Sequence, residues 1–319
     1  MTFGRERILA DADVAATFPY AALDASLWEY YVAATATDPK DVTAVEHDRT
    51  TGAPVAALVA AHGAEDVAFF GRAATFELAD GLSPESISAA GRTVAEDLEG
   101  RARDAGHRLT VEIVSREATL SGFEQVLIGS GASASLAFSA EVDLTLPEDR
   151  LWASLRKSYR SLINTGRREL TLEFVDEERP DQDLFDRYRE LHREVAGRAT
   201  RPAGSWEAMY RLISQGRAQL VVADLAGRPV AATYFMRLGR LALYASGAYV
   251  RDLGKFPVSH WPLYASMLHA RGAGVERLVL GTAFYGTDVE SSSKERSIAA
   301  FKRGFATTIA ARRSYSAGS

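Results

Sequence analysis

The chain has 319 residues, 47% of them hydrophobic and 25% charged, with a net charge of −5, 10 prolines, 25 glycines and no cysteine. This composition is typical of a globular protein long enough for two domains, and it excludes collagenous, disordered and coiled-coil proteins. Because cysteine is absent, disulfides, zinc–thiolate sites and a cysteine nucleophile are excluded as well.

The N-terminal segment shows no targeting signal. Residues 1–20 lack a basic stretch followed by an apolar one, so they do not predict a signal peptide. No stretch reaches the roughly 18 uninterrupted apolar residues that a membrane span needs. We therefore expect a cytoplasmic protein without a membrane span, and a monomer.

The first half of the chain predicts several strands, a long helix and a further strand. The helix is expected from about residue 84 to 104, and it ends at Gly106. Runs rich in β-branched residues and bounded by turn residues predict strands over 41–47, 54–61, 67–71 and 109–114.

A strand over 136–146 and a helix from Pro147 to Gly166 are expected between the halves. The apolar residues of this helix recur at helical spacing and define one buried face. Its polar side carries Arg156, Lys157 and Arg160, with few acidic residues nearby. Such a density of one charge predicts an anion-binding face; a merely solvated surface is the alternative.

The second half repeats the order of the first. The predicted helix begins at Ser259 or His260 and ends at Gly272 to Gly274. Segment 227–232 (GRPVAA) also matches segment 52–57 (GAPVAA), which favours an internal duplication over chance. Strands separated by glycine turns are expected over 218–225, 229–236, 241–250 and 278–280.

Charge is divided unequally between the halves. Residues 1–149 carry 10 basic and 25 acidic side chains, whereas residues 150–319 carry 27 basic and 17 acidic ones. An anionic partner is therefore expected to meet the second half. The acidic first half is compatible with a protein-docking surface.

A meander followed by a helix and a strand, occurring twice, is the layout of tandem GNAT-like acyltransferases. Residues 261–272, 279–281 and 294–305 resemble the FemABX family, which typically shows a helix and a strand that each end in glycine, then an I-x-x-F-K-x-G-F segment. Residues 151–160 are similar to the R-x-x-I-R helix of that family. The resemblance covers about 150–310 and is only architectural before it.

The resemblance implies an α/β (α+β) fold with two GNAT-like domains in tandem, each a mixed, mostly antiparallel sheet flanked by helices. We expect a degenerate, acidic domain over 1–147 and a basic domain over 148–319, without the helical arm of some members. The family forms amide bonds, typically by transferring an aminoacyl group from aminoacyl-tRNA to an amine. The expected acceptor is a small molecule or peptide, with no cofactor.

The sequence does not predict a standard acetyl-CoA site. Such a site uses backbone amides of a glycine-rich loop before a helix to hold the pyrophosphate. The equivalent residues 251–260 contain one glycine and Pro257, which lacks an amide proton. The first-half counterpart, residues 76–83, is acidic. Acyl-CoA-dependent acylation of an amino sugar or cell-surface precursor, and a non-catalytic binding protein, remain the alternatives.

The resemblance assigns Lys302 to the tRNA acceptor end or to the charge that develops during transfer. His260 is a candidate base and Asp288 a candidate for binding the acceptor amine, although a capping or partly buried structural histidine and plain turn chemistry are the favoured explanations. Candidate phosphate-binding residues are Lys294, Arg303, Lys255, Arg156, Lys157 and Arg160. Candidate acceptor-binding residues are His192, Arg198, Arg201, Tyr244 and Tyr285.

Other chemistries find no support in the sequence. The six histidines show no H-E-x-x-H or other metal spacing, so no metal site is predicted. There is no G-x-S-x-G elbow, Walker A motif or Rossmann fingerprint. DNA-binding modules are also absent, and any RNA contact would involve phosphates and the acceptor end.

Overall fold

The computed structural model describes residues 2–285 and 291–318. Contacts within the chain divide it into two units, one formed by Met1–Ala137 with Ala311–Ser319 and the other by Phe138–Ala310. Two strands, β9 (Ser133–Asp143) and β15 (Thr308–Ala317), each contribute residues to both units. The division therefore differs from the one drawn at residue 147, because the end of the chain returns to the first unit.

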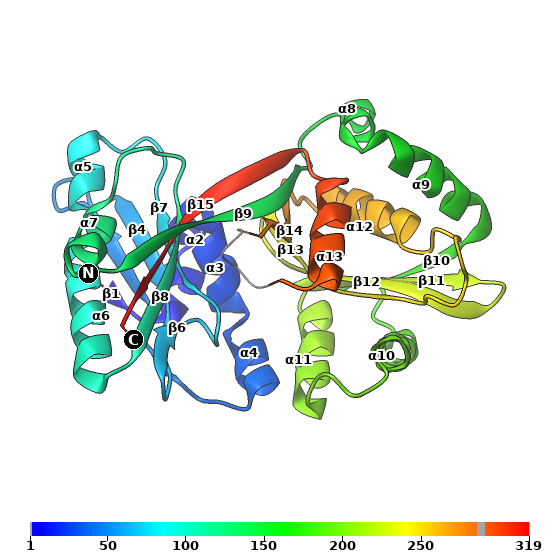
Figure 1. Ribbon diagram of the computed structural model, residues 1–319, viewed down its shortest axis with the longest axis horizontal. Coiled ribbons are helices and arrows are strands. Elements are labelled where there is room, and N and C mark those ends of the chain that lie inside the picture. The colour runs from blue at the N-terminus through cyan, green and yellow to red at the C-terminus, as the bar shows by residue number, and fades with distance from the viewer. Residues whose placement is uncertain (1, 286–290, 319) are drawn as a thin grey trace. The chain divides into compact units, whose positions relative to one another are not determined.

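The first unit is built around a mixed sheet (Figure 1). Strands β1, β3, β4 and β7 pair antiparallel in that order, β8 is parallel to β7, and β15 pairs antiparallel with β8. A short branch of β2, β5 and β6 also joins β8. The elements are β1 (Thr2–Phe3), α1 (Arg5–Ala10), α2 (Ala12–Thr17), α3 (Pro19–Ser26), α4 (Trp28–Thr35), β2 (Lys40–Asp41), β3 (Ala44–His47), β4 (Pro54–Val59), β5 (Ala61–His62), β6 (Asp66–Ala68), β7 (Ala74–Leu78), α5 (Pro84–Ala89), α6 (Arg92–Ala105), β8 (Arg108–Val114) and α7 (Gly122–Gly129).

The single helix predicted over 84–104 is wrong, because the structure has two helices separated at Gly91. This residue has φ +76°, and a Cβ atom there would overlap the ring of Phe76 and the Cβ atom of Phe123. The two phenylalanine rings stack with their centroids 4.3 Å apart in the core of the unit. Phe76 itself lies in β7, a strand that the sequence analysis treated as part of a loop.

The second unit contains one sheet in the order β9-β14-β13-β12-β11-β10, with only β13 and β14 parallel among these pairs. Helices α9 and α12 supply residues to a core on one face, including Ile163 and Met267. On the other face, Tyr188 of α10 stacks on Tyr234, whose hydroxyl donates to a backbone oxygen of α11 (Figure 1). The elements are α8 (Glu148–Ser154), α9 (Lys157–Glu169), β10 (Thr171–Val175), α10 (Gln182–Ala196), α11 (Ala203–Ser214), β11 (Ala218–Leu225), β12 (Arg228–Leu238), β13 (Leu241–Tyr249), α12 (His260–Gly272), β14 (Arg277–Phe284) and α13 (Ser293–Arg303).

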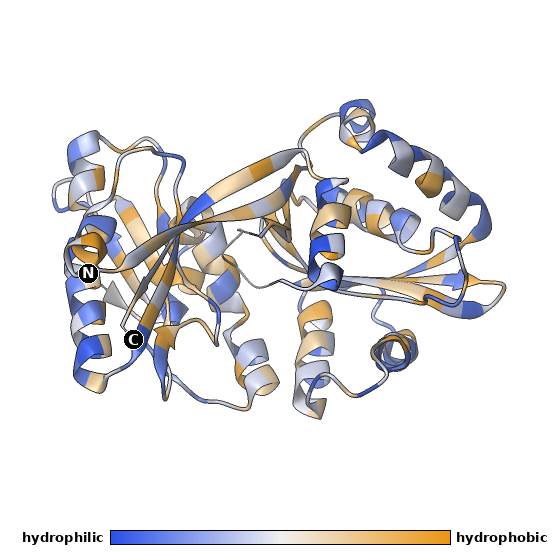
Figure 2. Cartoon of the chain, viewed as in Figure 1, coloured by the Kyte–Doolittle hydropathy of each residue, from blue (hydrophilic) through white to orange (hydrophobic). Residues whose placement is uncertain are grey.

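The helix predicted from Pro147 to Gly166 is also two helices, α8 and α9. Its continuity is lost at Leu155 and Arg156, where the Arg156 amide donates to the Gly304 oxygen at 2.9 Å instead of to its own helix. Arg160 donates to the Ala153 oxygen at 2.5 Å and so satisfies a free carbonyl at the end of α8. Hydrophilic residues cover much of α9 (Figure 2), as expected for its exposed side.

The predicted duplication and fold class are confirmed. In each unit, antiparallel strands are followed by helix and then by a strand that runs parallel to the last antiparallel strand. In the first unit these elements are β7, then α5 and α6, then β8. In the second unit they are β13, then α12, then β14. The strands predicted over 218–225, 229–236 and 241–250 agree with β11, β12 and β13 to within two residues. Among the described residues, no helix combines the length and apolarity needed to cross a bilayer.

Candidate functional site

The two parallel strands of the second unit pair only near their beginnings. Residues 241–243 of β13 pair with 277–279 of β14, although both strands continue well beyond these positions. On its other side, β13 has a bulge at Ala245, since Tyr234 pairs with Ser246 and Phe235 with Tyr244. A bulge increases local twist and re-aims nearby side chains. Tyr244 and Gly281 thus lie past the paired region, on the two strands.

Lys302 lies beside these two residues. It occupies the last turn of α13, and its Nζ atom is 5.9 Å from the centroid of the Tyr244 ring. A Cβ atom at Gly281 would come within 2.9 Å of Nζ, so the ammonium group lies against the bare backbone of β14. Within residues 2–285 and 291–318, Nζ has no hydrogen bond or ion pair. Burial lowers the pKa of Lys302.

Three hydroxyl groups form a chain next to this lysine. The hydroxyl oxygens of Tyr244 and Tyr249 are 2.7 Å apart, and that of Tyr249 is 3.2 Å from Oγ1 of Thr233. Burial raises the pKa of Tyr244 well above its ordinary value, so the phenol is protonated. Gly247 makes room for the pair, because a Cβ atom there would overlap the Tyr244 hydroxyl. The sequence analysis singled out Tyr244 and missed Tyr249, Thr233 and Gly247.

His260 is enclosed by aromatic rings at the start of α12. Its ring centroid is 4.6 Å from that of Tyr159 and 5.3 Å from that of Phe301. Burial, with a contribution from the Arg156 charge, lowers the pKa of His260 to about 4. The imidazole is therefore neutral at pH 7 and weakly basic, which favours a packing role over general-base catalysis.

Three of the candidate phosphate-binding arginines are engaged inside the second unit. Arg156 lies over the Tyr159 ring and donates to the Ala300 oxygen at 3.0 Å. Arg303 lies over Phe284 and donates to the Ala283 oxygen. Arg160 binds the end of α8, as described above. These side chains help to hold α9 and α13 in place, and this use occupies part of their hydrogen-bonding capacity.

The candidate lysines are placed differently. Lys157, Lys255 and Lys294 are exposed, and none has a hydrogen bond or ion pair to a described residue. Tyr285 is partly buried just after β14. Asp288 lies outside the described residues.

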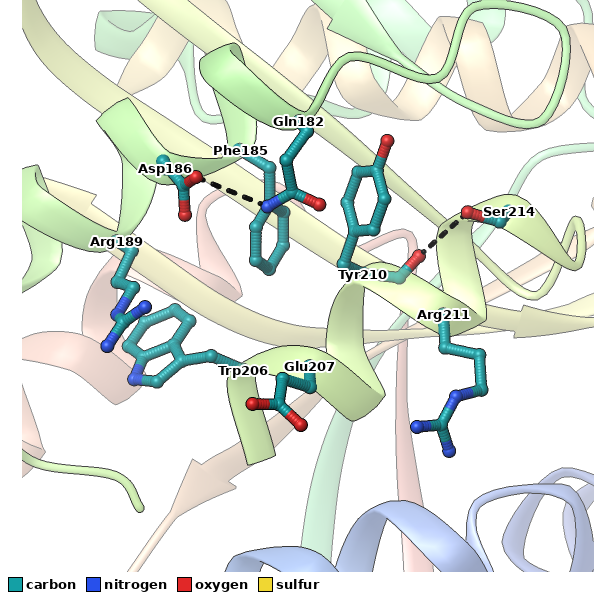
Figure 3. Close-up of a pocket in the computed structure, with 9 residues that line it drawn as sticks. All are labelled: Gln182, Phe185, Asp186, Arg189, Trp206, Glu207, Tyr210, Arg211 and Ser214. Carbon is teal, nitrogen blue, oxygen red and sulfur yellow. Dashed lines mark hydrogen bonds between the residues drawn. The ribbon is translucent and has the colours of Figure 1, made fainter. Parts of the chain in front are cut away.

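The three remaining acceptor candidates lie together. His192, Arg198 and Arg201 line a cavity of about 400 Å³ at the connection between α10 and α11. The Thr200 hydroxyl lies 3.3 Å from Nδ1 of His192, and the Arg201 guanidinium lies over the ring of Trp206. A second cavity of about 330 Å³ follows along the same two helices, and Figure 3 shows its lining. Trp206 lines both cavities but was not predicted.

Neither a metal nor a pyrophosphate has an evident site in the described ranges. No group of three or more acidic or histidine side chains among these residues could hold a metal ion. In the turn before α12, the amides of Phe256 and Val258 donate to the oxygens of Leu253 and Phe256. Pro257 between them has no amide proton, so residues 256–258, directly before α12, offer no free amide to a pyrophosphate.

Comparison with known proteins places the second unit in a known domain class. Residues 153–294 match the family model of the acetyltransferase (GNAT) domain, Acetyltransf_6. No curated protein matches the sequence significantly.

Solved structures extend the likeness to nearly the whole chain. FemX shares 14% identity over 90% of both chains, with a TM-score of 0.63. The C-terminal DUF2156 domain assigned to a lysylphosphatidylglycerol synthetase of Agrobacterium fabrum shares 17% identity, covers 92% of this chain and 87% of that one, and has a TM-score of 0.56. L-PGS of Bacillus licheniformis shares 12% identity over 92% and 90%, with a TM-score of 0.52.

These likenesses confirm the predicted resemblance at the level of the fold. The second unit has the sequence of a GNAT domain, and the chain as a whole folds like FemX. Residues 153–294 are thus similar to the acetyltransferase (GNAT) domain, and the fold of the chain is similar to that of FemX.

Proposed function

We propose that the protein transfers an aminoacyl group from aminoacyl-tRNA to an amine of a small molecule or peptide, forming an amide. The observation that carries this proposal is the environment of Lys302. Its ammonium group is desolvated, has no carboxylate partner among the described residues, and lies where β13 and β14 no longer pair. A cation held in such a place is available to stabilise negative charge that develops in a reaction.

The reaction needs little covalent help from the protein. The neutral acceptor amine attacks the carbonyl carbon of the ester, and the carbonyl oxygen becomes an oxyanion, which Lys302 stabilises. The C–O bond to the tRNA ribose then breaks as the amide forms, and the proton lost by the amine passes to the departing ribose oxygen. Alignment of the two substrates and charge stabilisation supply most of the rate gain.

Two features of the second unit favour an ester donor carried on tRNA. Residues 256–258, directly before α12, offer no free amide for the pyrophosphate of coenzyme A, whereas Lys157, Lys255 and Lys294 are exposed and have no partner among the described residues. Unpaired surface lysines suit contacts with the phosphates of RNA. The name of one structural relative, a lysylphosphatidylglycerol synthetase, describes a product that carries an amino acid.

The acceptor is proposed to enter through the cavity at His192 and Arg198. Burial and the charge of Arg201 lower the pKa of His192, so its imidazole is neutral at pH 7 and offers a hydrogen bond without charge. The arginines at this cavity suit an acceptor that also carries an anionic group.

A second candidate is transfer of an acyl group from acyl-CoA to an amine. The match of residues 153–294 to an acetyltransferase domain favours it. In that case the segment 251–259 would bind pyrophosphate in an unusual way, through amides other than those of residues 256–258.

Binding of donors distinguishes the two candidates. The purified protein is titrated with bulk aminoacylated tRNA and, separately, with acetyl-CoA, at about 50 and 200 mM salt. We expect tRNA binding that weakens steeply with salt, because each neutralised phosphate releases a counterion, and no binding of acetyl-CoA. Acetyl-CoA binding without tRNA binding would overturn the aminoacyl proposal and support the second candidate.

A further inference from the structure

The two cavities along α10 and α11 form one groove. The cavity at the 197–202 connection and the one shown in Figure 3 share Asp186, Arg189 and Trp206 in their linings. Their volumes, about 400 and 330 Å³, each lie in the range of small-molecule sites. Gly197 ends α10 in the left-handed conformation and turns the chain, which brings the connection back over the helix.

One end of the groove carries an excess of positive charge. Arg189, Arg193, Arg198 and Arg201 line the cavity at the connection, against two carboxylates, those of Asp186 and Glu190. Arg193 and Arg198 have no hydrogen bond or ion pair to any residue that the structure describes. Two guanidinium groups without partners at one cavity are available to an anion.

The other end of the groove has an aromatic floor. Phe185 and Trp206 are buried, and Tyr210 is half-buried beside them. In Figure 3 the three rings lie in a row between α10 and α11, with Gln182, Asp186 and Glu207 around them. Phe185, at 1% exposure, lies beneath the other two rings, so the apolar area open to a ligand comes from Tyr210 and from the exposed 6% of Trp206.

We propose that this groove binds an amphipathic anion, with an aromatic or aliphatic body along Trp206 and Tyr210 and a carboxylate or phosphate at Arg193 and Arg198. The identification of this molecule as the amine-bearing acceptor rests on the function proposed above. The guanidinium fork matches the paired oxygens of both anions, so the shared chemistry is an oxyanion next to an apolar body.

Calorimetric titration with probes that share one body tests the proposal. The probes are 3-phenylpropionate, phenyl phosphate, the neutral 3-phenylpropionamide and the cationic phenethylamine. Acetate and inorganic phosphate serve as anions that lack the phenyl group. We expect at least one of the two phenyl anions to bind about tenfold or more tightly than the amide, the amine and the bare anions. The preferred phenyl anion then identifies the head group. Equal binding of the amide or amine would overturn the proposal.

Variants locate the binding. Arg198→Gln is expected to weaken the preferred anion about tenfold and to leave the neutral amide unchanged, whereas Arg150→Gln, an exposed arginine on α8 outside the groove, changes neither. Trp206→Leu is expected to weaken every phenyl probe. Since Trp206 is buried, Tyr210→Ala serves as a second floor variant if Trp206→Leu does not fold. Unchanged binding by Arg198→Gln would contradict the assignment.

These titrations use neither tRNA nor coenzyme A, so the two proposals fail separately. Anion binding that depends on Arg198, in a protein that transfers no aminoacyl group, would overturn the proposed function and leave the groove assignment intact. Aminoacyl transfer by a protein whose anion binding does not depend on Arg198 would overturn the groove assignment and leave the proposed function intact.

Discussion

Lys302 is the residue on which the proposed chemistry depends. Burial lowers its pKa, and its Nζ atom contacts the open backbone at Gly281 without any anionic partner among the described residues. Replacing Lys302 by Met keeps the aliphatic stem and removes the charge. We expect a loss of about 100-fold in kcat for aminoacyl transfer, similar to the removal of an oxyanion-stabilising donor in other enzymes.

The matched control is Lys40→Met, an exposed lysine of the first unit. Both variants should keep the unfolding midpoint of the parent chain in urea. Full transfer activity in a folded Lys302→Met variant would contradict the role given to this lysine.

Gly281 is expected to position Lys302. Its φ of +94° strains any other residue, and an added Cβ atom would press on the Lys302 ammonium at 2.9 Å. Gly274 offers a control, because it has φ +84° with nothing within 4 Å of its Cβ position. Both alanine variants should lose about 1–2 kcal/mol of stability from backbone strain, but only Gly281→Ala should also lose transfer activity. Equal activity losses in the two variants would show that strain alone is responsible.

His260 makes stability depend on pH. Its pKa is about 4 in the folded chain, below the ordinary value of 6.5, so the unfolded chain takes up the proton first as the pH falls. Stability from this residue is complete above pH 6.5 and is lost between pH 6.5 and 4, by about 1–3 kcal/mol. His260→Phe should remove this part of the pH dependence, measured as the difference between the urea unfolding curves of the two proteins at pH 4.5 and 7. An identical pH dependence in both would contradict this account.

Sequence motifs drew attention to individual residues but did not predict the contacts that those residues make. The closing I-x-x-F-K-x-G-F pattern predicted a role for Lys302, whereas Gly281 was expected only to end a strand, and β14 in fact continues to Phe284. The Lys302 side chain lies against the Gly281 backbone because of the way α13 packs on β14. Similarly, Arg156 was read as a surface cation because helical periodicity cannot show that its guanidinium reaches Ala300, 144 residues further along the chain.

At the scale of elements, α9 and α13 are held by arginines that the sequence suggested for phosphate binding. Arg156→Gln removes the hydrogen bond to Ala300 and the contact over Tyr159, and should cost about 1–2 kcal/mol of stability. The neighbouring Lys157 is exposed and unpaired among the described residues, so Lys157→Gln should change stability by less than about 0.5 kcal/mol.

The two variants should differ in tRNA binding as well. Lys157→Gln is expected to weaken binding and to reduce the slope of log K against log salt by about 1, as for one lost phosphate contact. Stability is followed by urea unfolding and binding by filter retention. A destabilised Lys157→Gln variant, or one with an unchanged salt slope, would argue against this division of roles.

Both long helices predicted from periodicity proved to be pairs of shorter ones. Apolar spacing continues across each interruption, so the pattern alone gives no sign of a break. The breaks arise from contacts with residues far away in the chain. The Gly304 oxygen accepts a hydrogen bond from the Arg156 amide, and the side chains of Phe76 and Phe123 occupy the space beside Gly91. Tertiary hydrogen bonds and packing outweigh a helical preference of a few tenths of a kcal/mol per residue.

At the scale of the whole molecule, the end of the chain completes the first unit. Residues 313–317 pair with β8, and Tyr315 is buried in the core of that unit. Glu124 is fully buried, and the side chains of Arg313 and Tyr315 bind its carboxylate. A chain that stops after Ala310 therefore leaves a buried carboxylate without these partners, which should destabilise the first unit by about 3–5 kcal/mol.

Hydrogen exchange checks this prediction locally. In the shortened chain, the amides of β8 should exchange much faster, whereas those of β12 in the second unit should keep their protection. Arg313→Met in the complete chain provides a milder variant with the same direction of effect. Loss of protection in β12 but not in β8 would contradict the assignment of the last residues to the first unit.

The sequence by itself determined the class of fold, its duplication and the main catalytic candidate. These depend on local patterns, namely alternating apolar residues, glycine turns and a short motif, and here the local patterns agree with the global fold. Only the tertiary structure decided which cations are free, where the helices break, which residues form the groove of α10 and α11, and to which unit the last strand belongs. Each of these depends on contacts between residues far apart in the chain, such as Arg313 with Glu124, 189 positions away.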